Sequence, residues 1–227
     1  MNTTKSKSPK YASSDRGARH NPRKEQINSL NIHFANVRGL VTNKKCAHQH
    51  LESRRPDILV LTETKVSSDI FENEFHFKRY QFEQAFEFQR GLCVFVKENI
   101  PYSRHQNYEI FTKSAQTIVL KISLPNKLIF LISLYRSPNQ TDSETMNFFE
   151  GLSDKCDDIR NKHPDSELIM VGDFNAHHKE WLNHRDTNIA AGVMWNGLPF
   201  HMTSLRLLVI PHLNVKTREV FIFWISV

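Results

Sequence analysis

Segment 168–175, which reads Leu-Ile-Met-Val-Gly-Asp-Phe-Asn, constrains the fold more than any other part of the sequence. Its apolar run has the length of a buried strand and is too short for an independent helix. Asp173 and Asn175 follow a glycine and are two residues apart, so on an extended chain they would point to the same side. Ligands often bind at the carboxyl ends of strands in α/β sheets. A functional site and a simple Asx turn both fit these residues.

Two earlier segments also end in polar side chains. Residues 30–35 alternate between apolar and polar positions, which is typical of a strand, and a polar turn beginning at Asn36 follows. Residues 57–61 have the composition of a buried strand and lead to Glu63. This repetition predicts that strand ends bring several functional groups together.

A hairpin supplies a further group. Two runs rich in β-branched residues, 117–124 and 127–134, flank Pro125-Asn126, which predicts two antiparallel strands, and Tyr135 follows the second. Thr141 and Glu144 have the spacing of a capping box and predict the start of a helix.

The remaining elements complete an alternating pattern. The sequence predicts a short helix over residues 43–55, a loop with an edge strand within 71–89, and a strand over 91–97. Alternation of strands and helices implies an α/β fold, and the hairpin indicates that its sheets are mixed.

Composition fits one globular domain of 227 residues without an apolar run of the roughly 20 residues that span a membrane. The polar N-terminus gives no sign of a secretory signal. The three widely spaced cysteines are typical of reduced thiols in an intracellular protein. Cys46, His48 and His50 fit no zinc spacing, so a solvated helix face is the preferred interpretation.

Positive charge is concentrated at the N-terminus. Residues 1–25 hold seven Lys or Arg and two acids, a net +5 of the chain's total +6. We predict that residues 1–29 form a basic disordered tail. Such a tail either contacts nucleic acid phosphates or only improves solubility.

The predicted side chains suit phosphodiester hydrolysis if they meet at one end of two packed sheets. Glu63 would hold a divalent cation such as Mg²⁺ or Mn²⁺, which prefers oxygen ligands and polarises phosphate oxygens. Asp173 would orient or deprotonate a water, Asn175 would hold a phosphate oxygen, and Tyr135 would donate to the developing charge. Taken singly, Glu63 also fits a plain strand-end carboxylate, and Tyr135 a buried core tyrosine.

Several motifs together resemble the endonuclease/exonuclease/phosphatase superfamily, which has the deoxyribonuclease I-like fold. More narrowly, they resemble the apurinic-type endonuclease domain of non-LTR retrotransposons. The matching motifs are Asn-Val-Arg-Gly-Leu at 36–40, Asp-Ile-Leu-Val-Leu-Thr-Glu-Thr at 57–64, residues 91–96, Leu-Tyr-Arg-Ser-Pro-Asn at 134–139, and Gly-Asp-Phe-Asn-Ala-His-His at 172–178 with Trp181.

The resemblance implies a four-layer α/β sandwich of two mixed β-sheets flanked by helices. It also implies that Glu63 binds the metal and that Asn36 helps position the metal and the phosphate, with catalytic roles for both and for Tyr135, Asp173 and Asn175. Members of the retroelement branch nick target DNA, and the free 3′-hydroxyl primes reverse transcription. DNA as the target implies a nuclear location, with no membrane partner and no small-molecule cofactor.

The resemblance fails after about Asn188. The family has a late Asp and a Ser-Asp-His near the end of the domain, and neither is present in this sequence. We therefore expect an incomplete domain at residues 30–190, with its C-terminal strands missing or replaced. Residues 191–227 are interpreted as a divergent tail, with the hypothesis that they are out of frame. If suitable codons are chosen for these residues and translation starts at the third base, the new frame encodes His-Asp-Leu-Thr near His201. The same shift gives a Leu-Asp pair near Trp224.

The function predicted from the sequence is a metal-dependent DNA endonuclease of the target-nicking type, impaired by the loss of these motifs. Two alternatives are a non-catalytic remnant of a retroelement and a repair-type apurinic endonuclease. A lipid or inositol phosphatase shares the fold and is disfavoured by the retroelement-type motifs.

Overall fold

The computed structural model describes residues 30–67, 75–85 and 90–175, together with two C-terminal strands at 204–205 and 221–225. The predicted N-terminal tail, and His177, His178 and Trp181 of the last motif, lie outside the described residues. None of the described helices is both long enough and apolar enough to cross a bilayer.

The first sheet has four strands in the order β1-β2-β4-β3. Strands β1 and β2 run parallel and are joined by helix α1, while β4 is antiparallel to both β2 and β3. The sheet is therefore mixed, and its β-α-β unit brings the carboxyl ends of β1 and β2 to the same edge. The elements are β1 (Ile32–Asn36), α1 (Leu40–Arg54), β2 (Ile58–Thr62), β3 (Tyr80–Ala85) and β4 (Leu92–Lys97).

The second sheet has six strands in the order β5-β6-β7-β8-β10-β9. The predicted hairpin is its β6–β7 pair, and helix α3 joins β7 to the parallel strand β8. This second β-α-β unit has the same form as the first. The elements are β5 (Tyr102–Arg104), the 3₁₀ helix η1 (Gln106–Tyr108), β6 (Ala115–Leu124), β7 (Lys127–Arg136), α3 (Asp142–Lys162), β8 (Ser166–Asp173), β9 (Ser204–Leu205) and β10 (Phe221–Ile225).

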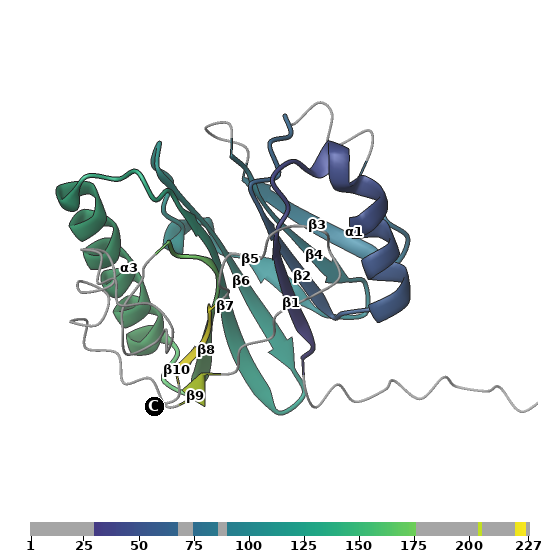
Figure 1. Ribbon diagram of the computed structural model, residues 1–227. Helices are drawn as coiled ribbons and strands as arrows, with labels where there is room; N and C mark the ends of the chain where they lie inside the picture. The colour runs from purple at the N-terminus through teal and green to yellow at the C-terminus, as the bar shows by residue number, and fades with distance from the viewer. Residues whose placement is uncertain (1–29, 68–74, 86–89, 176–203, 206–220, 226–227) are drawn as a thin grey trace, which may run out of the picture.

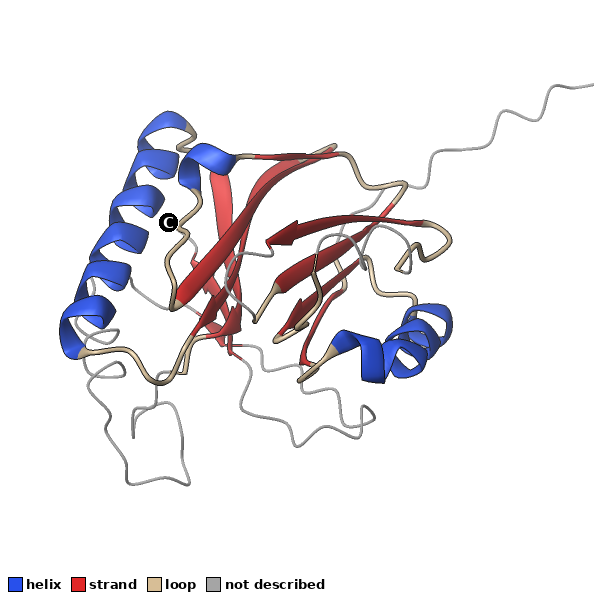
Figure 2. Ribbon diagram, turned by 90° about the horizontal axis from the view of Figure 1, so that it is seen from above, coloured by secondary structure: helices blue, strands red, loops and turns tan. Residues whose placement is uncertain are grey.

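The elements form four layers, as the sequence predicted. Helix α1 covers the outer face of the first sheet and helix α3 covers the outer face of the second (Figure 1). Viewed from above, the two sheets lie between the two helices (Figure 2). Strand β10 pairs with β8 in antiparallel orientation. That the C-terminal strands are missing or replaced stays a prediction.

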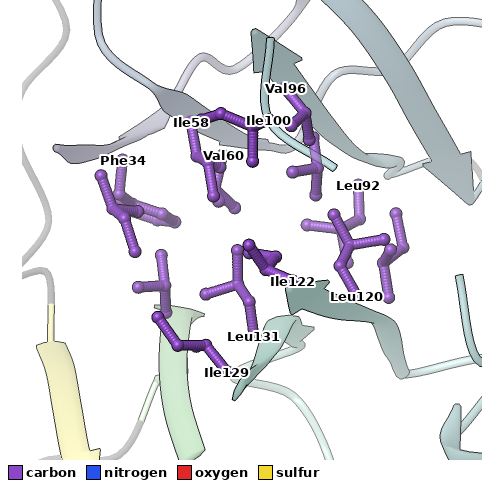
Figure 3. Close-up of a cluster of buried hydrophobic side chains, with 14 of the residues drawn as sticks. Phe34, Ile58, Val60, Leu92, Val96, Ile100, Leu120, Ile122, Ile129 and Leu131 are labelled. Atoms are coloured by element: carbon purple, nitrogen blue, oxygen red, sulfur yellow. The ribbon is translucent and has the colours of Figure 1, made fainter. Parts of the chain in front are cut away.

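An apolar core fills the space between the two sheets (Figure 3). Both sheets contribute aliphatic side chains that are almost fully buried, among them Val60, Val94, Leu120 and Leu131. Removal of this apolar surface from water is the main force that holds the sheets together. Because both faces of each sheet are covered, β2 and β4 are apolar along nearly their whole length.

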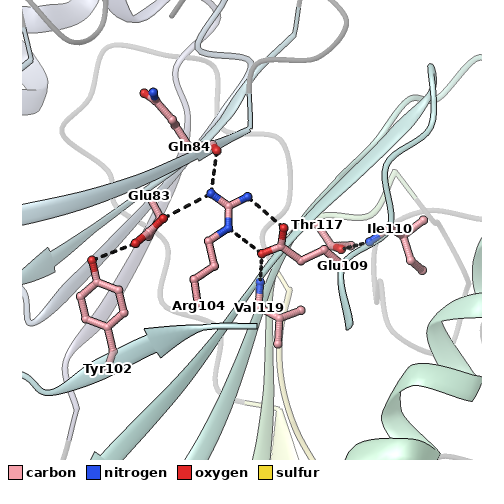
Figure 4. Close-up of polar contacts among 8 residues, drawn as sticks. All are labelled: Glu83, Gln84, Tyr102, Arg104, Glu109, Ile110, Thr117 and Val119. Atoms are coloured by element: carbon pink, nitrogen blue, oxygen red, sulfur yellow. Dashed lines mark hydrogen bonds and ion pairs between the residues drawn. The ribbon is translucent and has the colours of Figure 1, made fainter. Parts of the chain in front are cut away.

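Polar side chains connect the sheets at their edge strands β3 and β5 (Figure 4). Arg104 donates to Glu109 at 2.8 and 2.9 Å and reaches across to Glu83 at 3.2 Å. Glu109 also accepts the backbone N–H of Val119. Every charge in this partly buried cluster has a partner of opposite sign, which lowers the cost of taking the Glu109 carboxylate out of water.

Helix α1 begins at Leu40, three residues before the predicted start. Gly39 precedes it and has no side chain that caps the helix. The first turn is instead held by the loop after β2, whose carbonyls at Glu63 and Thr64 accept the N–H groups of Gly39 and Leu40 at 2.8 and 2.7 Å. A cap that comes from another part of the chain leaves no local sequence signal.

The predicted solvated face of this helix is wrong for His50. His48 is exposed, whereas His50 is buried and lies 2.7 Å from His33 of β1. Burial, His33 and the charge of Arg54 lower the pKa of His50 to about 4, and burial also lowers the pKa of His33. The two rings therefore share one hydrogen bond as neutral groups.

The histidine pair makes stability depend on pH. Because the pKa of His50 is lower in the folded than in the unfolded state, its contribution is present above pH 6.5 and is lost as pH falls toward 4. We expect the free energy of unfolding to be about 2 kcal/mol lower at pH 5 than at pH 8 from this site. Urea denaturation at both pH values measures this difference in the free energy of unfolding. His50→Gln should remove most of this dependence, whereas His48→Gln on the same helix should retain it; equal dependence in all three proteins would contradict the assignment.

Candidate active site

The carboxyl ends of the two β-α-β units meet at one site. Asn36 is the last residue of β1 and pairs with Thr62 of β2, while Tyr135 of β7 pairs with Asp173 of β8. Glu63 directly follows β2. The sheet registers therefore bring together four of the five residues that the sequence selected, and Asn175 lies two residues beyond β8.

The Asn36 amide connects the two sheets at this site. Its Nδ2 donates to Oε1 of Glu63 at 3.0 Å and to Oδ2 of Asp173 at 2.9 Å. Its Oδ1 accepts the backbone N–H of Arg38 at 3.3 Å. In this orientation Asn36 holds two carboxylates at a fixed separation. Both the nitrogen and the oxygen of its amide have hydrogen-bond partners.

The structure confirms the Asx turn at Asp173 and Asn175, and their role in a functional site stays a prediction. Oδ1 of Asp173 accepts the N–H of Asn175 at 3.2 Å, which is an Asx turn, while Oδ2 takes part in the site. The expectation that both side chains point to one side of an extended chain is wrong, because Asn175 has a φ of 46°. Its Nδ2 donates to the carbonyl of Arg136 at 2.6 Å. An amide carries two N–H groups, and this contact uses one of them.

Gly172 is required where β8 approaches β7. A Cβ atom at this position would lie 1.9 Å from the carbonyl oxygen of Leu134. Any other residue would push β8 away from β7 and shift Asp173 with it. The glycine of the Gly-Asp-Phe-Asn segment thus has a packing role that sets the position of the next residue.

Arg136 is buried beneath the site, and sequence analysis assigned it no role. Its guanidinium donates to the carbonyls of Phe174 and Asn175, both at 2.6 Å, and to Gln140 and Thr145. Burial lowers its pKa to about 10, although the nearby charge of Asp173 opposes the shift. Arg136 therefore remains a cation at neutral pH and fixes the turn that carries Asn175.

Tyr135 is buried and faces the acidic groups of the site. Burial raises the pKa of its hydroxyl, and the charges of Glu63 and Asp173 add to the rise. Arg90 donates a hydrogen bond to the hydroxyl oxygen and partly offsets this effect. The hydroxyl is therefore protonated at neutral pH and available as a donor.

The donor set suits a hard divalent cation. Glu63 and Asp173 offer carboxylate oxygens beside the Asn36 amide, and such oxygen ligands are what Mg²⁺ and Mn²⁺ bind. Within the described residues, no cluster of three or more His, Cys, Asp or Glu side chains is present. A metal held here would therefore keep several waters, as Mg²⁺ usually does. The metal contact expected of Asn36 remains a prediction.

A comparison with known sequence families finds one match. A family described as "Endonuclease-reverse transcriptase" matches residues 129–202, which include Tyr135, Asp173 and Asn175. No curated protein matches the chain. The matched segment and the fold together give the chain its resemblance to the endonuclease/exonuclease/phosphatase superfamily.

Solved structures share this fold at low sequence identity. The endonuclease domain of TRAS1, a telomere-specific non-LTR retrotransposon, has a TM-score of 0.61 at 15% identity, over 86% of this chain and 97% of that domain. TDP2 from Caenorhabditis elegans has a TM-score of 0.55 at 20% identity, over 69% of this chain. The match covers about half (51%) of that TDP2 chain. AP endonuclease LMAP from Leishmania major has a TM-score of 0.51 at 16% identity, over 67% and 57% of the two chains.

Replacement of Arg136 tests its role in the turn. Arg136→Met removes the donors of two buried carbonyl groups, and we expect the free energy of unfolding to fall by about 3 kcal/mol. Urea denaturation at pH 7.5 measures the loss. Lys162→Met, which removes an exposed cation that pairs with Asp158 on α3, is the matched control and should change stability far less. Similar losses in both variants would contradict a special role for Arg136.

Proposed function

We propose that this chain is a metal-dependent DNA endonuclease of the type that nicks target DNA for a non-LTR retrotransposon. The observation that carries the proposal is the pair of carboxylates, Glu63 and Asp173, joined by the Asn36 amide at the meeting point of the two sheets. The family match over residues 129–202 and the shared fold of the TRAS1 endonuclease domain support this choice.

Each residue has a role in the proposed hydrolysis. Glu63 would hold the divalent cation together with Asn36, and the bound cation would polarise a phosphate oxygen and stabilise charge on the leaving oxygen. Asp173 would orient a water and accept its proton. The Tyr135 hydroxyl would donate to the phosphate as its charge grows, and the second N–H of Asn175 would hold a phosphate oxygen.

The first prediction of this proposal concerns nicking. Purified full-length chain with Mg²⁺ should convert supercoiled plasmid to the open-circular form, and EDTA should stop the reaction. Asp173→Asn removes the proposed proton acceptor and should lower the rate by about 100-fold or more. Glu167→Gln is the matched control, since Glu167 lies on the same strand and pairs with Lys127. If Asp173→Asn nicks as fast as the unchanged chain, the activity does not come from this site.

Metal binding provides a test that does not depend on turnover. A cation that binds only the folded chain raises its melting temperature as the cation concentration increases. We expect such a rise with Mg²⁺ or Mn²⁺ in the unchanged chain and in Glu167→Gln. Glu63→Gln should show little or none, because it lacks the proposed anionic ligand. An equal rise in all three proteins would place the metal elsewhere.

Abasic DNA distinguishes the repair-type alternative. This alternative is supported by the shared fold of the Leishmania AP endonuclease. Comparison of an intact duplex with one that contains a single abasic site separates the two activities. Strong preference for the abasic duplex would favour repair, whereas comparable cleavage of both favours target nicking.

We further propose that turnover is slow, because the sequence contains no Ser-Asp-His to contact the scissile phosphate.

We also propose the division into a tail at 1–29, an incomplete domain at 30–190 and a divergent segment at 191–227. Base sequencing from the codon of Asn188 onward tests the last boundary. A second frame that encodes Leu-Asp and then Ser-Asp-His would support it, and the absence of such a frame would make the segment the protein's own.

A further inference from the structure

Arg90 is positioned by the loop that carries Glu63. The backbone N–H of Lys65 donates to the Arg90 carbonyl at 3.0 Å, and that of Thr64 donates to the carbonyl of Gly91 at 3.3 Å. A Cβ atom at Gly91 would lie 2.1 Å from Oγ1 of Thr64, and Gly91 has a φ of 69°. Only glycine therefore permits this close approach, which fixes Arg90 beside the end of β2.

The Arg90 side chain lies against Tyr135. Its guanidinium carbon is 5.7 Å from the centre of the tyrosine ring, and one of its N–H groups donates to the hydroxyl oxygen. A guanidinium has only donors, so the tyrosine oxygen must accept. The hydroxyl proton is therefore directed away from Arg90.

Arg90 supplies positive charge beside this tyrosine, opposite to two carboxylates. Glu63 and Asp173 act on Tyr135 electrostatically, and Arg90 acts on it with the opposite sign. Among the described residues, no carboxylate lies within 4.0 Å of the Arg90 guanidinium. Arg90 has five N–H donors in a planar fork that matches the oxygens of a phosphate. A phosphodiester beside Tyr135 would give the remaining donors partners.

We propose that Arg90 is a catalytic residue that contacts a non-bridging oxygen of the scissile phosphate together with the Tyr135 hydroxyl. This rests on the proposed endonuclease function. No bond to Arg90 forms or breaks: it stabilises the negative charge that grows on the phosphate while Asp173 accepts the proton of the water. A simpler role, in which Arg90 only packs on the tyrosine ring, predicts a loss of stability instead.

The experiment compares Arg90→Gln and Arg90→Lys in the full-length chain with Arg79→Gln, which replaces an exposed arginine. We expect single-turnover nicking with Mg²⁺ to fall about 100-fold in Arg90→Gln and about 10-fold in Arg90→Lys. Arg79→Gln should stay within about twofold, and all melting temperatures should agree within a few degrees. Duplex binding with Ca²⁺ should show a salt dependence with a slope smaller by about one in Arg90→Gln.

Each other result overturns a distinct part of the proposal. Unchanged nicking in Arg90→Gln removes the role of Arg90 and leaves the endonuclease function intact. A loss of nicking that accompanies a large fall in melting temperature, with no recovery in Arg90→Lys, assigns Arg90 to packing.

If the unchanged chain does not nick DNA at all, the proposed function fails. Binding of inorganic phosphate then tests whether Arg90 contacts a phosphate. Calorimetry with inorganic phosphate and Mg²⁺ should then give binding that Arg90→Gln abolishes. Absent or equal binding in the two proteins overturns the proposal for Arg90 as well.

Discussion

The packing of two apolar sheet faces is the constraint on which the rest of the structure depends. Aliphatic side chains from both sheets fill the space between them, so the separation and alignment of the sheets are set by close packing (Figure 3). Each sheet contains one β-α-β unit whose parallel strands end at the same edge. Once the faces are packed, these edges come together, and Asn36 reaches Asp173 although 137 residues separate them.

The same packing requires the site to be organised before any substrate arrives. Asn36, Asp173 and Asn175 are all less than 8% exposed, and a buried polar group without a partner is costly. They satisfy one another: Asn36 donates to Asp173, and Asp173 accepts from the backbone of Asn175. The buried Arg136 donates to the carbonyl group of Asn175 and so holds the turn in place. Groups that hold one another in place need little rearrangement, which would favour the proposed reaction through preorganisation.

Sequence patterns predicted the elements of this fold well and its long-range contacts poorly. Apolar runs and the capping box at Thr141 are local signals, so strands β1, β2, β4, β6, β7 and β8 and the start of helix α3 were predicted nearly to the residue, whereas the short strand β5 was missed. The start of α1 was missed because its first turn is held by the loop at Glu63. His50 and Arg136 look like ordinary polar residues, and only their tertiary partners make them buried. The candidate residues were singled out because each lies at or just beyond the end of a strand, whereas Arg90 precedes one and gave no such signal.

Charge distribution bears on how the proposed DNA substrate would approach the site. Residues 1–25 carry a net +5 of the total +6, which leaves about +1 for the rest of the chain. The remainder of the chain therefore has little net charge with which to attract a polyanion over long distances. It also presents two carboxylates, Glu63 and Asp173, where a phosphate would have to bind. A phosphodiester can approach these acids only if positive charge lies within a few ångströms, and a bound divalent cation on one side of Tyr135 with Arg90 on the other would meet that requirement.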